Sequence, residues 1–198
     1  MKSIRTENTT LRLVVGSLLY QGVWFATVLS SSSAARWWWG VLAVIGFAGF
    51  AAYGWPNLRQ RVWVMASAAV ACGLVVDTAM LAGRVWYAPS MLMPAPLPPL
   101  WLVMLWAAFG MYIAISLEML YGRYGVATIV GAFGGMLAYR GGAWLGAIEW
   151  GKPAWLSTAI LMLAWAAVFP VLVWVATKWR AQEQTVTARV SRTRVAFM

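Results

Sequence analysis

The sequence predicts an all-α membrane protein, a bundle of six transmembrane helices with a proline-rich loop between the third and the fourth. Of the 198 residues, 63% are hydrophobic and only 10% are charged, whereas soluble domains are about half apolar and about a quarter charged. The chain also carries 15 Trp, a residue that concentrates where hydrocarbon meets lipid head groups. Together with a series of long apolar runs, these features place the chain in a lipid bilayer.

The apolar runs match the length of about 20 residues that a helix needs to cross the hydrocarbon core. They cover residues 11–30, 37–55, 62–83, 100–120, 126–147 and 155–177. The first run begins with Arg12 and lacks the small-residue cleavage site of a signal peptide, so it is predicted to be a retained span. Residues 1–10 and the basic tail 178–198 are polar and are expected outside the bilayer.

The connection formed by residues 84–99 differs from the others because it is apolar yet rich in proline. Prolines at positions 89, 94, 96, 98 and 99 exclude a continuous helix. Exposed irregular backbone is not tolerated in hydrocarbon, so this segment should lie at the interface or fold back over the bundle. A covering loop is the favoured interpretation, and a lid is the alternative.

The distribution of basic residues predicts the orientation. With six spans, both termini and the second and fourth connections share one side. That side would hold Lys2, Arg5, Arg12, Arg59, Arg61, Arg123, Lys178, Arg180, Arg189, Arg192 and Arg194, against Arg36, Arg84 and Lys152 on the other. The positive-inside rule then places both termini in the cytoplasm, with the protein in the bacterial inner membrane. Topology and anionic lipids explain the net charge of +10 better than nucleic-acid binding does.

The residue types that are missing exclude much of enzyme chemistry. The chain contains no His, and its single Cys, Cys72, lies in an apolar run. A metal site built from His or Cys, a His-based catalytic triad and an internal disulfide are therefore excluded. We expect no metal and no cofactor, and no catalytic residue can be named.

Two charges within apolar runs form the first candidate site. Counted along their helices, Asp77 and Arg140 lie at similar depth, toward the side opposite the termini. An isolated charge at depth costs on the order of 3 kcal/mol, so they are expected to pair or to face a cavity. Arg84, one heptad after Asp77, and Glu149 extend this polar cluster toward the surface. Two interpretations stay open, an ion pair that fixes helix packing and a pocket for an anionic head group or carboxylate.

A second polar cluster surrounds Glu118, near the predicted cytoplasmic end of its span. Tyr121, Arg123 and Tyr124 follow it closely in the sequence. Because water and an arginine are near, a structural ion pair with Arg123 is favoured over a functional role. Farther along, Gly131 and Gly135, like Gly142 and Gly146, have the small-xxx-small spacing that lets another helix approach closely.

Several stretches resemble one known family. They are YQGVWFATVL at residues 20–29, GLVVDTAMLAG at 73–83, PLPPLWLVMLWAAFG at 96–110, GAFGGMLAYRGGAWLGA at 131–147 and WAAVFP at 165–170. In their order, they resemble the bacterial inner-membrane family named domain of unknown function 2878. This chain has Gly134-Gly135 where the family would have Gly-Pro. The resemblance implies a small multispanning protein, and its members are often encoded near fatty-acid-modifying enzymes.

Three functional hypotheses follow. The first is a non-catalytic component that binds membrane lipids or docks a membrane or cytoplasmic protein partner, linked to the modification of membrane fatty acids. The second is a small transporter or flippase with a polar pocket lined by Asp77 and Arg140. The third, an intramembrane enzyme using Asp77 or Glu118 as acid or base, has the least support because no nucleophile or cofactor motif accompanies these residues.

Overall fold

The computed structural model describes residues 2–31, 37–89 and 96–196. The helices in this part of the chain are α1 (Lys2–Ser31), α2 (Trp37–Gly54), α3 (Arg59–Ala82), α4 (Leu100–Ser116), α5 (Tyr124–Trp144) and α6 (Ala154–Ala196). Two short 3-10 turns, η1 (Pro56–Leu58) and η2 (Glu118–Leu120), precede α3 and follow α4. A pair of two-residue strands, β1 (Trp86–Tyr87) and β2 (Glu149–Trp150), completes the described elements.

The all-α class is confirmed, with one helix at each of the six apolar runs. Three helical segments are long and apolar enough to cross a membrane: Thr10–Ser31, Pro56–Ala82 and Ala154–Val186. Two shorter apolar helices, Trp38–Gly54 and Leu100–Ser116, accompany them. The chain thus has the helices of a multi-pass membrane protein. Proline at position 170 does not end α6, which runs for 43 residues and includes most of the basic tail.

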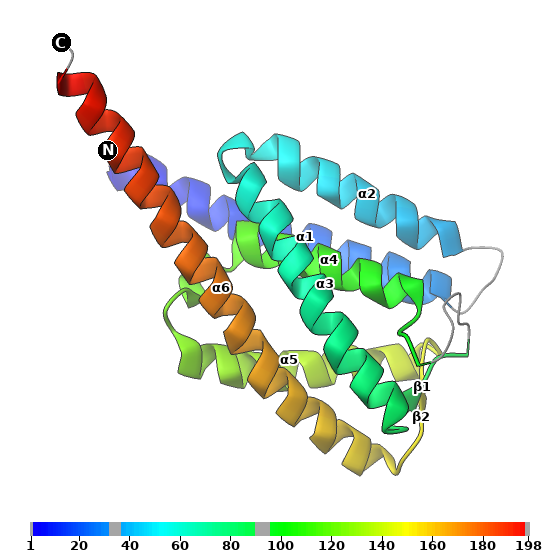
Figure 1. The fold of residues 1–198 in the computed structure, drawn as a ribbon. Coiled ribbons are helices and arrows are strands. Elements are labelled where there is room, and N and C mark those ends of the chain that lie inside the picture. The colour runs from blue at the N-terminus through cyan, green and yellow to red at the C-terminus, as the bar shows by residue number, and fades with distance from the viewer. Residues whose placement is uncertain (1, 32–36, 90–95, 197–198) are drawn as a thin grey trace.

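Successive helices run in opposite directions, so that short connections gather at two ends of the bundle (Figure 1). Helix α4 lies at the centre and packs against α1, α2 and α3, with a smaller contact to α6. Helix α5 packs mainly against α6. The last turns of α6 project beyond the bundle at the end where α1 begins (Figure 1). This arrangement leaves a junction between two pairs of helices, one formed by α1 and α4 and the other by α5 and α6.

Part of the proline-rich connection folds against the connection between α5 and α6. Strands β1 and β2 pair antiparallel, with Trp86 opposite Trp150. The backbone N–H of Gly151 and the hydroxyl of Ser157 both donate to the carbonyl oxygen of Val85, at 3.1 and 2.7 Å. The Trp86 side chain is fully buried beneath this pairing. Residues 90–95 lie outside the described residues, so the choice between a covering loop and a lid stays a prediction.

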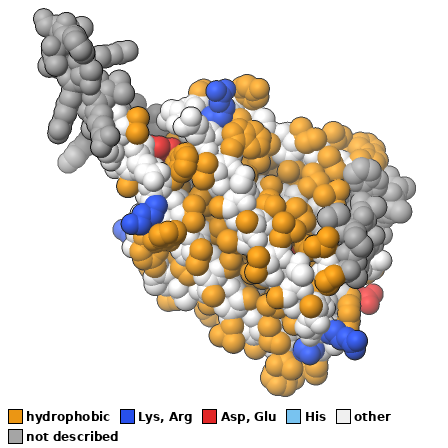
Figure 2. Space-filling view, viewed as in Figure 1, with side chains coloured by type: hydrophobic (Ala, Val, Ile, Leu, Met, Phe, Trp, Pro, Cys, Tyr) orange, Lys and Arg blue, Asp and Glu red, His pale blue; other side chains and the backbone are white. Residues whose placement is uncertain are grey.

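The flank of the bundle is apolar. In Figure 2, hydrophobic side chains cover much of the face between the two ends, and the few charged ones lie toward those ends. Leu18 on α1, Val75 on α3 and Leu163 on α6 are 69%, 72% and 73% exposed. An apolar surface of this kind is typical of a protein that faces lipid tails rather than water.

Candidate functional site

Asp77 is fully buried in the last third of α3 and binds two neutral donors. The indole N–H of Trp106, on α4, donates to Oδ2 of Asp77 at 2.6 Å. The hydroxyl of Tyr139, on α5, donates to Oδ1. Each carboxyl oxygen therefore has a hydrogen-bond partner, as a buried polar group requires. Through these bonds Asp77 joins α3 to α4 and α5.

The Trp106 ring also belongs to an aromatic stack that links four helices. Its indole lies parallel to that of Trp165 on α6, with ring centroids 4.7 Å apart and an interplanar angle of 7°. Glycine makes room at both outer faces: a Cβ at Gly73 on α3 would lie 2.3 Å from Cγ of Trp106, and one at Gly135 on α5 would lie 2.0 Å from Cγ of Trp165. The stack thus needs a residue without a side chain on each flanking helix.

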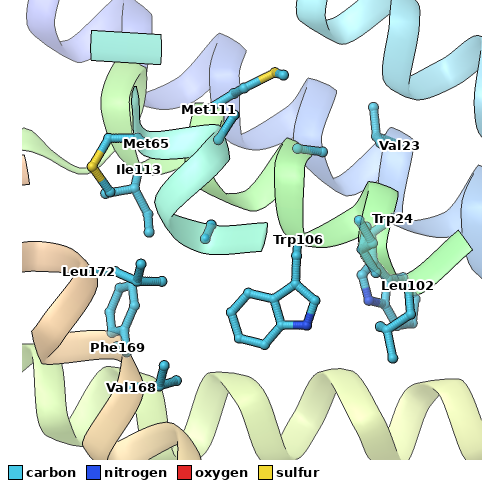
Figure 3. Packing of buried hydrophobic residues seen from close by; sticks show 14 of the residues in the cluster. Val23, Trp24, Met65, Leu102, Trp106, Met111, Ile113, Val168, Phe169 and Leu172 are labelled. Atoms are coloured by element: carbon cyan, nitrogen blue, oxygen red, sulfur yellow. The ribbon is translucent and has the colours of Figure 1, made fainter. Parts of the chain in front are cut away.

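A cavity lies beside this stack, at the junction between the two helix pairs. Its volume is about 50 Å³, several times the roughly 10–15 Å³ that the centre of one water molecule requires. Figure 3 shows the Trp106 ring projecting from α4 toward α5, with Trp24 and Leu102 beside it. The lining is almost entirely apolar and aromatic, and comprises Tyr20, Trp24, Val28, Trp101, Leu102, Leu105, Trp106, Phe109, Ala138, Tyr139, Gly142, Ile148 and Trp165.

Trp24 closes the space between α1 and α5. A Cβ placed on Gly141 would come within 3.0 Å of the Trp24 ring, so this indole reaches from α1 to the α5 backbone. Two other lining indoles, those of Trp101 and Trp165, have buried N–H groups without a hydrogen-bond partner among the described residues. The rings of both tryptophans form part of the cavity wall, whereas their N–H groups are shielded within the protein.

The expected pairing of Asp77 with Arg140 is wrong. Arg140 is exposed on the outer side of α5, and no ion pair joins it to Asp77 in the described part of the chain. Adjacent helical residues point about 100° apart, so when Tyr139 turns inward to Asp77, Arg140 turns away. Neither Asp77 nor Arg140 is among the residues that line the cavity beside the aromatic stack.

Arg84 and Glu149 are near the same end of the bundle but do not join Asp77. Helix α3 ends at Ala82, so Arg84 does not continue the helical face of Asp77. It instead has a left-handed backbone, with φ of 52°, and is exposed. Glu149 is exposed in β2, opposite Tyr87. The predicted cluster of four charges is thus reduced to one buried carboxyl with aromatic partners.

The second predicted cluster contains an ion-pair network, with different partners from those expected. Glu118 accepts from Arg61 on α3 at 2.6 Å and from Arg12 on α1 at 3.4 Å. Arg61 is buried and also pairs with Glu183 on α6. Arg123, the partner predicted from sequence proximity, is exposed. The network joins α1, α3 and α6 to the turn after α4.

Tyr121 lies under this network. The guanidinium carbons of Arg61 and Arg180 lie 6.0 and 5.8 Å from the centre of its ring, within the range of a cation–π contact. Its hydroxyl donates to the carbonyl oxygen of Ile113 at 3.2 Å. Burial raises the pKa of Tyr121 to about 12. Tyr124, by contrast, is 39% exposed at the start of α5.

The comparison with protein families matches residues 13–171 to a family described as "Protein of unknown function (DUF2878)". The chain belongs to this family. Comparisons with curated proteins and with solved structures found no match. The matched residues include Asp77, Trp106, Tyr139 and Trp165, so the site lies within the DUF2878 region.

Several residues at the centre of this DUF2878 chain could not be selected from the sequence. Trp106 and Trp165 are two among 15 Trp, and no spacing distinguishes them from those at the lipid interface. Tyr139 precedes the charged Arg140, and the sequence alone does not show which of the two faces inward. Arg61 and Arg12 lie near the ends of apolar runs, where basic residues indicate orientation rather than a particular partner. Among the described residues, no group of three or more His, Cys, Asp or Glu side chains could hold a metal ion.

Proposed function

We propose that this protein is a six-span inner-membrane protein that binds the apolar part of a membrane lipid in its aromatic cavity. The observation that supports the proposal is the cavity of about 50 Å³ between α1, α4, α5 and α6, lined by aromatic and aliphatic side chains. Small-molecule sites are typically concave, mostly apolar and equipped with a few polar groups. Here the lining is almost entirely aromatic and aliphatic, which suits the hydrocarbon part of a lipid.

The orientation belongs to the same proposal. Basic residues concentrate at the end that carries both termini, which places that end in the cytoplasm. The cavity then lies toward the periplasmic half, because Trp101 is the second residue of α4 and Gly142 lies near the end of α5. The resemblance to this family implies a gene that lies near genes for fatty-acid-modifying enzymes. The ligand we favour is therefore a lipid on which such an enzyme acts.

Binding is a better interpretation than transport or catalysis. A transport pathway lined by Asp77 and Arg140 would need both side chains at one cavity, and neither lines it. An acid or base must reach a substrate, yet Asp77 is fully buried and both its oxygens accept hydrogen bonds from the protein. Glu118 is likewise engaged by two arginines. These contacts favour structural roles for both carboxyls.

Filling the cavity tests the proposal. In Ala138→Phe a ring would replace a methyl group on the cavity wall. Leu137→Phe is the matched control, because Leu137 is the preceding residue of α5 and is 63% exposed. Both variants and the wild type would be extracted into nanodiscs with native lipid, exchanged into mild detergent, and analysed by native mass spectrometry for retained lipid.

We expect the wild type and Leu137→Phe to retain lipid and Ala138→Phe to lose it. Equal retention by all three would contradict cavity binding. The link to fatty-acid modification is tested separately by deleting the gene, and an unchanged fatty-acid profile would count against it. Lipid binding itself is decided by the mass spectrometry.

A further inference from the structure

We infer that Arg140 binds the phosphate group of a phospholipid on the outer, lipid-facing side of α5. The sequence predicts an anionic head group as one possible ligand of this arginine, and the exposure of Arg140 puts that ligand on the flank of the bundle rather than in a pocket with Asp77. Three properties of Arg140 support this: the side of α5 on which it lies, its depth, and its lack of a carboxylate partner among the described residues.

Arg140 lies on the side of α5 that faces lipid tails. At 100° per residue, Arg140 and the exposed hydrophobic side chains of α5 from residue 126 onward fall within one arc of about 100°. These exposed side chains are Val126, Ile129, Val130, Phe133, Leu137 and Trp144. Arg140 is the one charged residue of α5 and is exposed on the same stripe. A stripe that contacts hydrocarbon ordinarily excludes charge, so this arginine needs an anion.

Arg140 also lies close to one surface of the membrane. Helix α5 has 21 residues, so it spans about 31 Å, close to the roughly 30 Å thickness of the hydrocarbon core. Trp144 at its end and Trp155 at the start of α6 are highly exposed, as expected of indoles where hydrocarbon meets head groups. Arg140 precedes Trp144 by four residues and is thus about 6 Å inside that boundary. A long arginine side chain near a helix end can extend to the head groups.

A lipid phosphate is the anion that fits this position. No carboxylate forms an ion pair with Arg140 in the described part of the chain. Glu149, the acid nearest to it in the sequence, lies beyond the end of α5, in β2. A guanidinium can bind two phosphate oxygens at once through its planar fork, and lipid phosphates lie at the level that the side chain reaches. The alternative occupant is a carboxylate of a neighbouring membrane protein.

This lipid is not the one proposed for the cavity. On α5 the cavity is lined by Ala138, Tyr139 and Gly142. Arg140 is two residues from Ala138 and two from Gly142, a rotation of about 200° that places it nearly on the opposite side of the helix. The two sites are therefore separate, and either can fail experimentally without the other.

A photoreactive residue on the same stripe can identify the neighbouring lipid. p-Benzoylphenylalanine would replace Leu137, which is exposed and lies one turn deeper than Arg140. In a second protein it would replace Leu163, which is exposed on α6, a helix without a charged residue before Lys178. Each full-length protein would be placed in nanodiscs of dioleoylphosphatidylglycerol with a minor fraction of dioleoylglycerol, which has the same chains but no phosphate. After irradiation, the mass of the protein adduct shows which lipid was captured.

We expect the ratio of phospholipid adducts to diacylglycerol adducts to be higher at position 137 than at position 163. Arg140→Gln removes the charge and should lower the ratio at 137 roughly tenfold, the lower end of the effect of hydrogen bonds to charged groups. It should leave the ratio at 163 unchanged. Arg84→Gln is the matched control, because Arg84 is exposed at the same end of the bundle, and it should change neither ratio.

Equal ratios at position 137 with and without the Arg140 charge would overturn the inference. An equal loss in Arg84→Gln would do the same, because diffuse charge at this end would then explain the preference. If Arg140→Gln failed to fold, equal ratios at 137 and 163 in the proteins that retain Arg140 would still overturn it. Irradiation of the position-137 protein in cell membranes tests the alternative occupant: a lipid adduct is expected, and a protein adduct in its place would assign the stripe to a membrane partner.

Discussion

The indole N–H of Trp106 donates to Oδ2 of Asp77 across 2.6 Å, and this bond fixes α4 against α3 at a fully buried carboxyl. The same indole stacks on Trp165 and lines the cavity. One side chain thus satisfies a buried polar group, carries the aromatic stack and forms part of the proposed binding wall. Changes at Asp77 are therefore expected to reach the cavity through Trp106.

Trp106→Phe should destabilise the protein without introducing a charge or a large steric change. Phenylalanine keeps a ring but removes the N–H, so Oδ2 of Asp77 loses its donor while it stays buried. Leaving a buried acceptor unsatisfied costs about 1–3 kcal/mol. Thermal unfolding in detergent would measure the loss, with Trp155→Phe as the control, because Trp155 is 72% exposed. Identical unfolding midpoints for the two variants would show that the Asp77 bond contributes nothing.

Adjacent glycines on α5 give a sharper test of the stack. In Gly135→Ala the new Cβ would lie 2.0 Å from Cγ of Trp165, so the indole or the helix must move. Such overpacking typically costs about 1–3 kcal/mol. In Gly134→Ala nothing lies within 4 Å of the new Cβ, and alanine favours a helix over glycine by up to about 1 kcal/mol.

We therefore expect opposite signs in the two variants, a lower unfolding midpoint for Gly135→Ala and an equal or higher one for Gly134→Ala. Intrinsic tryptophan fluorescence should change only in Gly135→Ala, because only that substitution displaces an indole. If both variants behaved alike, the close fit between Gly135 and Trp165 would be incorrect.

The helices could be predicted from the sequence because each requires a long apolar run, and such runs are visible in one dimension. The packing of Gly131 and Gly135 also followed from their spacing, and the structure confirms it: a Cβ on Gly131 would lie 2.6 Å from the carbonyl oxygen of Trp165. Gly146 shows the limit of that pattern. It has a left-handed backbone, with φ of 77°, just after α5, and no helix lies against it.

The partners of the charges could not be predicted, since they depend on helix rotation and on contacts distant in sequence. The charge of Arg140 predicts a buried partner, although the inward residue is Tyr139, one position earlier. Proximity in the sequence predicts that Glu118 pairs with Arg123, whereas its partners Arg61 and Arg12 lie 57 and 106 positions away. A buried charge predicts that a partner is needed. A helix that is apolar all round, however, has no alternation of polar and apolar residues that would show which of its sides faces the protein.

Arg61→Met should destabilise the end of the bundle that carries the termini. Arg61 pairs with both Glu118 and Glu183, so its loss leaves two carboxylates near each other. Removing one member of a buried ion pair costs roughly 3–5 kcal/mol, and partial exposure of Glu183 should place the effect at about the lower end. Unfolding by heat in detergent would measure it.

The control for Arg61→Met is Arg123→Met, which removes an exposed arginine and should change stability by no more than about 0.5 kcal/mol. Adding Glu118→Gln and Glu183→Gln to Arg61→Met should recover part of the loss, because the two side chains that Arg61 bridged are then uncharged and do not repel each other. A triple variant as unstable as Arg61→Met would mean that packing of the Arg61 stem, and not its charge, dominates.

Alkaline pH should separate Tyr121→Phe from the wild type. Burial raises the pKa of Tyr121 from 10.0 to about 12, so between these values the unfolded chain releases this proton while the folded chain retains it. The stability that Tyr121 contributes is therefore complete below pH 10 and is lost as pH rises from 10 toward 12.

Phenylalanine keeps the ring beneath Arg61 and Arg180 but has no proton to lose. Unfolding midpoints measured from pH 8 to 11 should fall more steeply for the wild type, since all other ionisable groups are shared. A difference between the two proteins that stayed constant across this range would mean that the Tyr121 hydroxyl reaches water and ionises equally in both states.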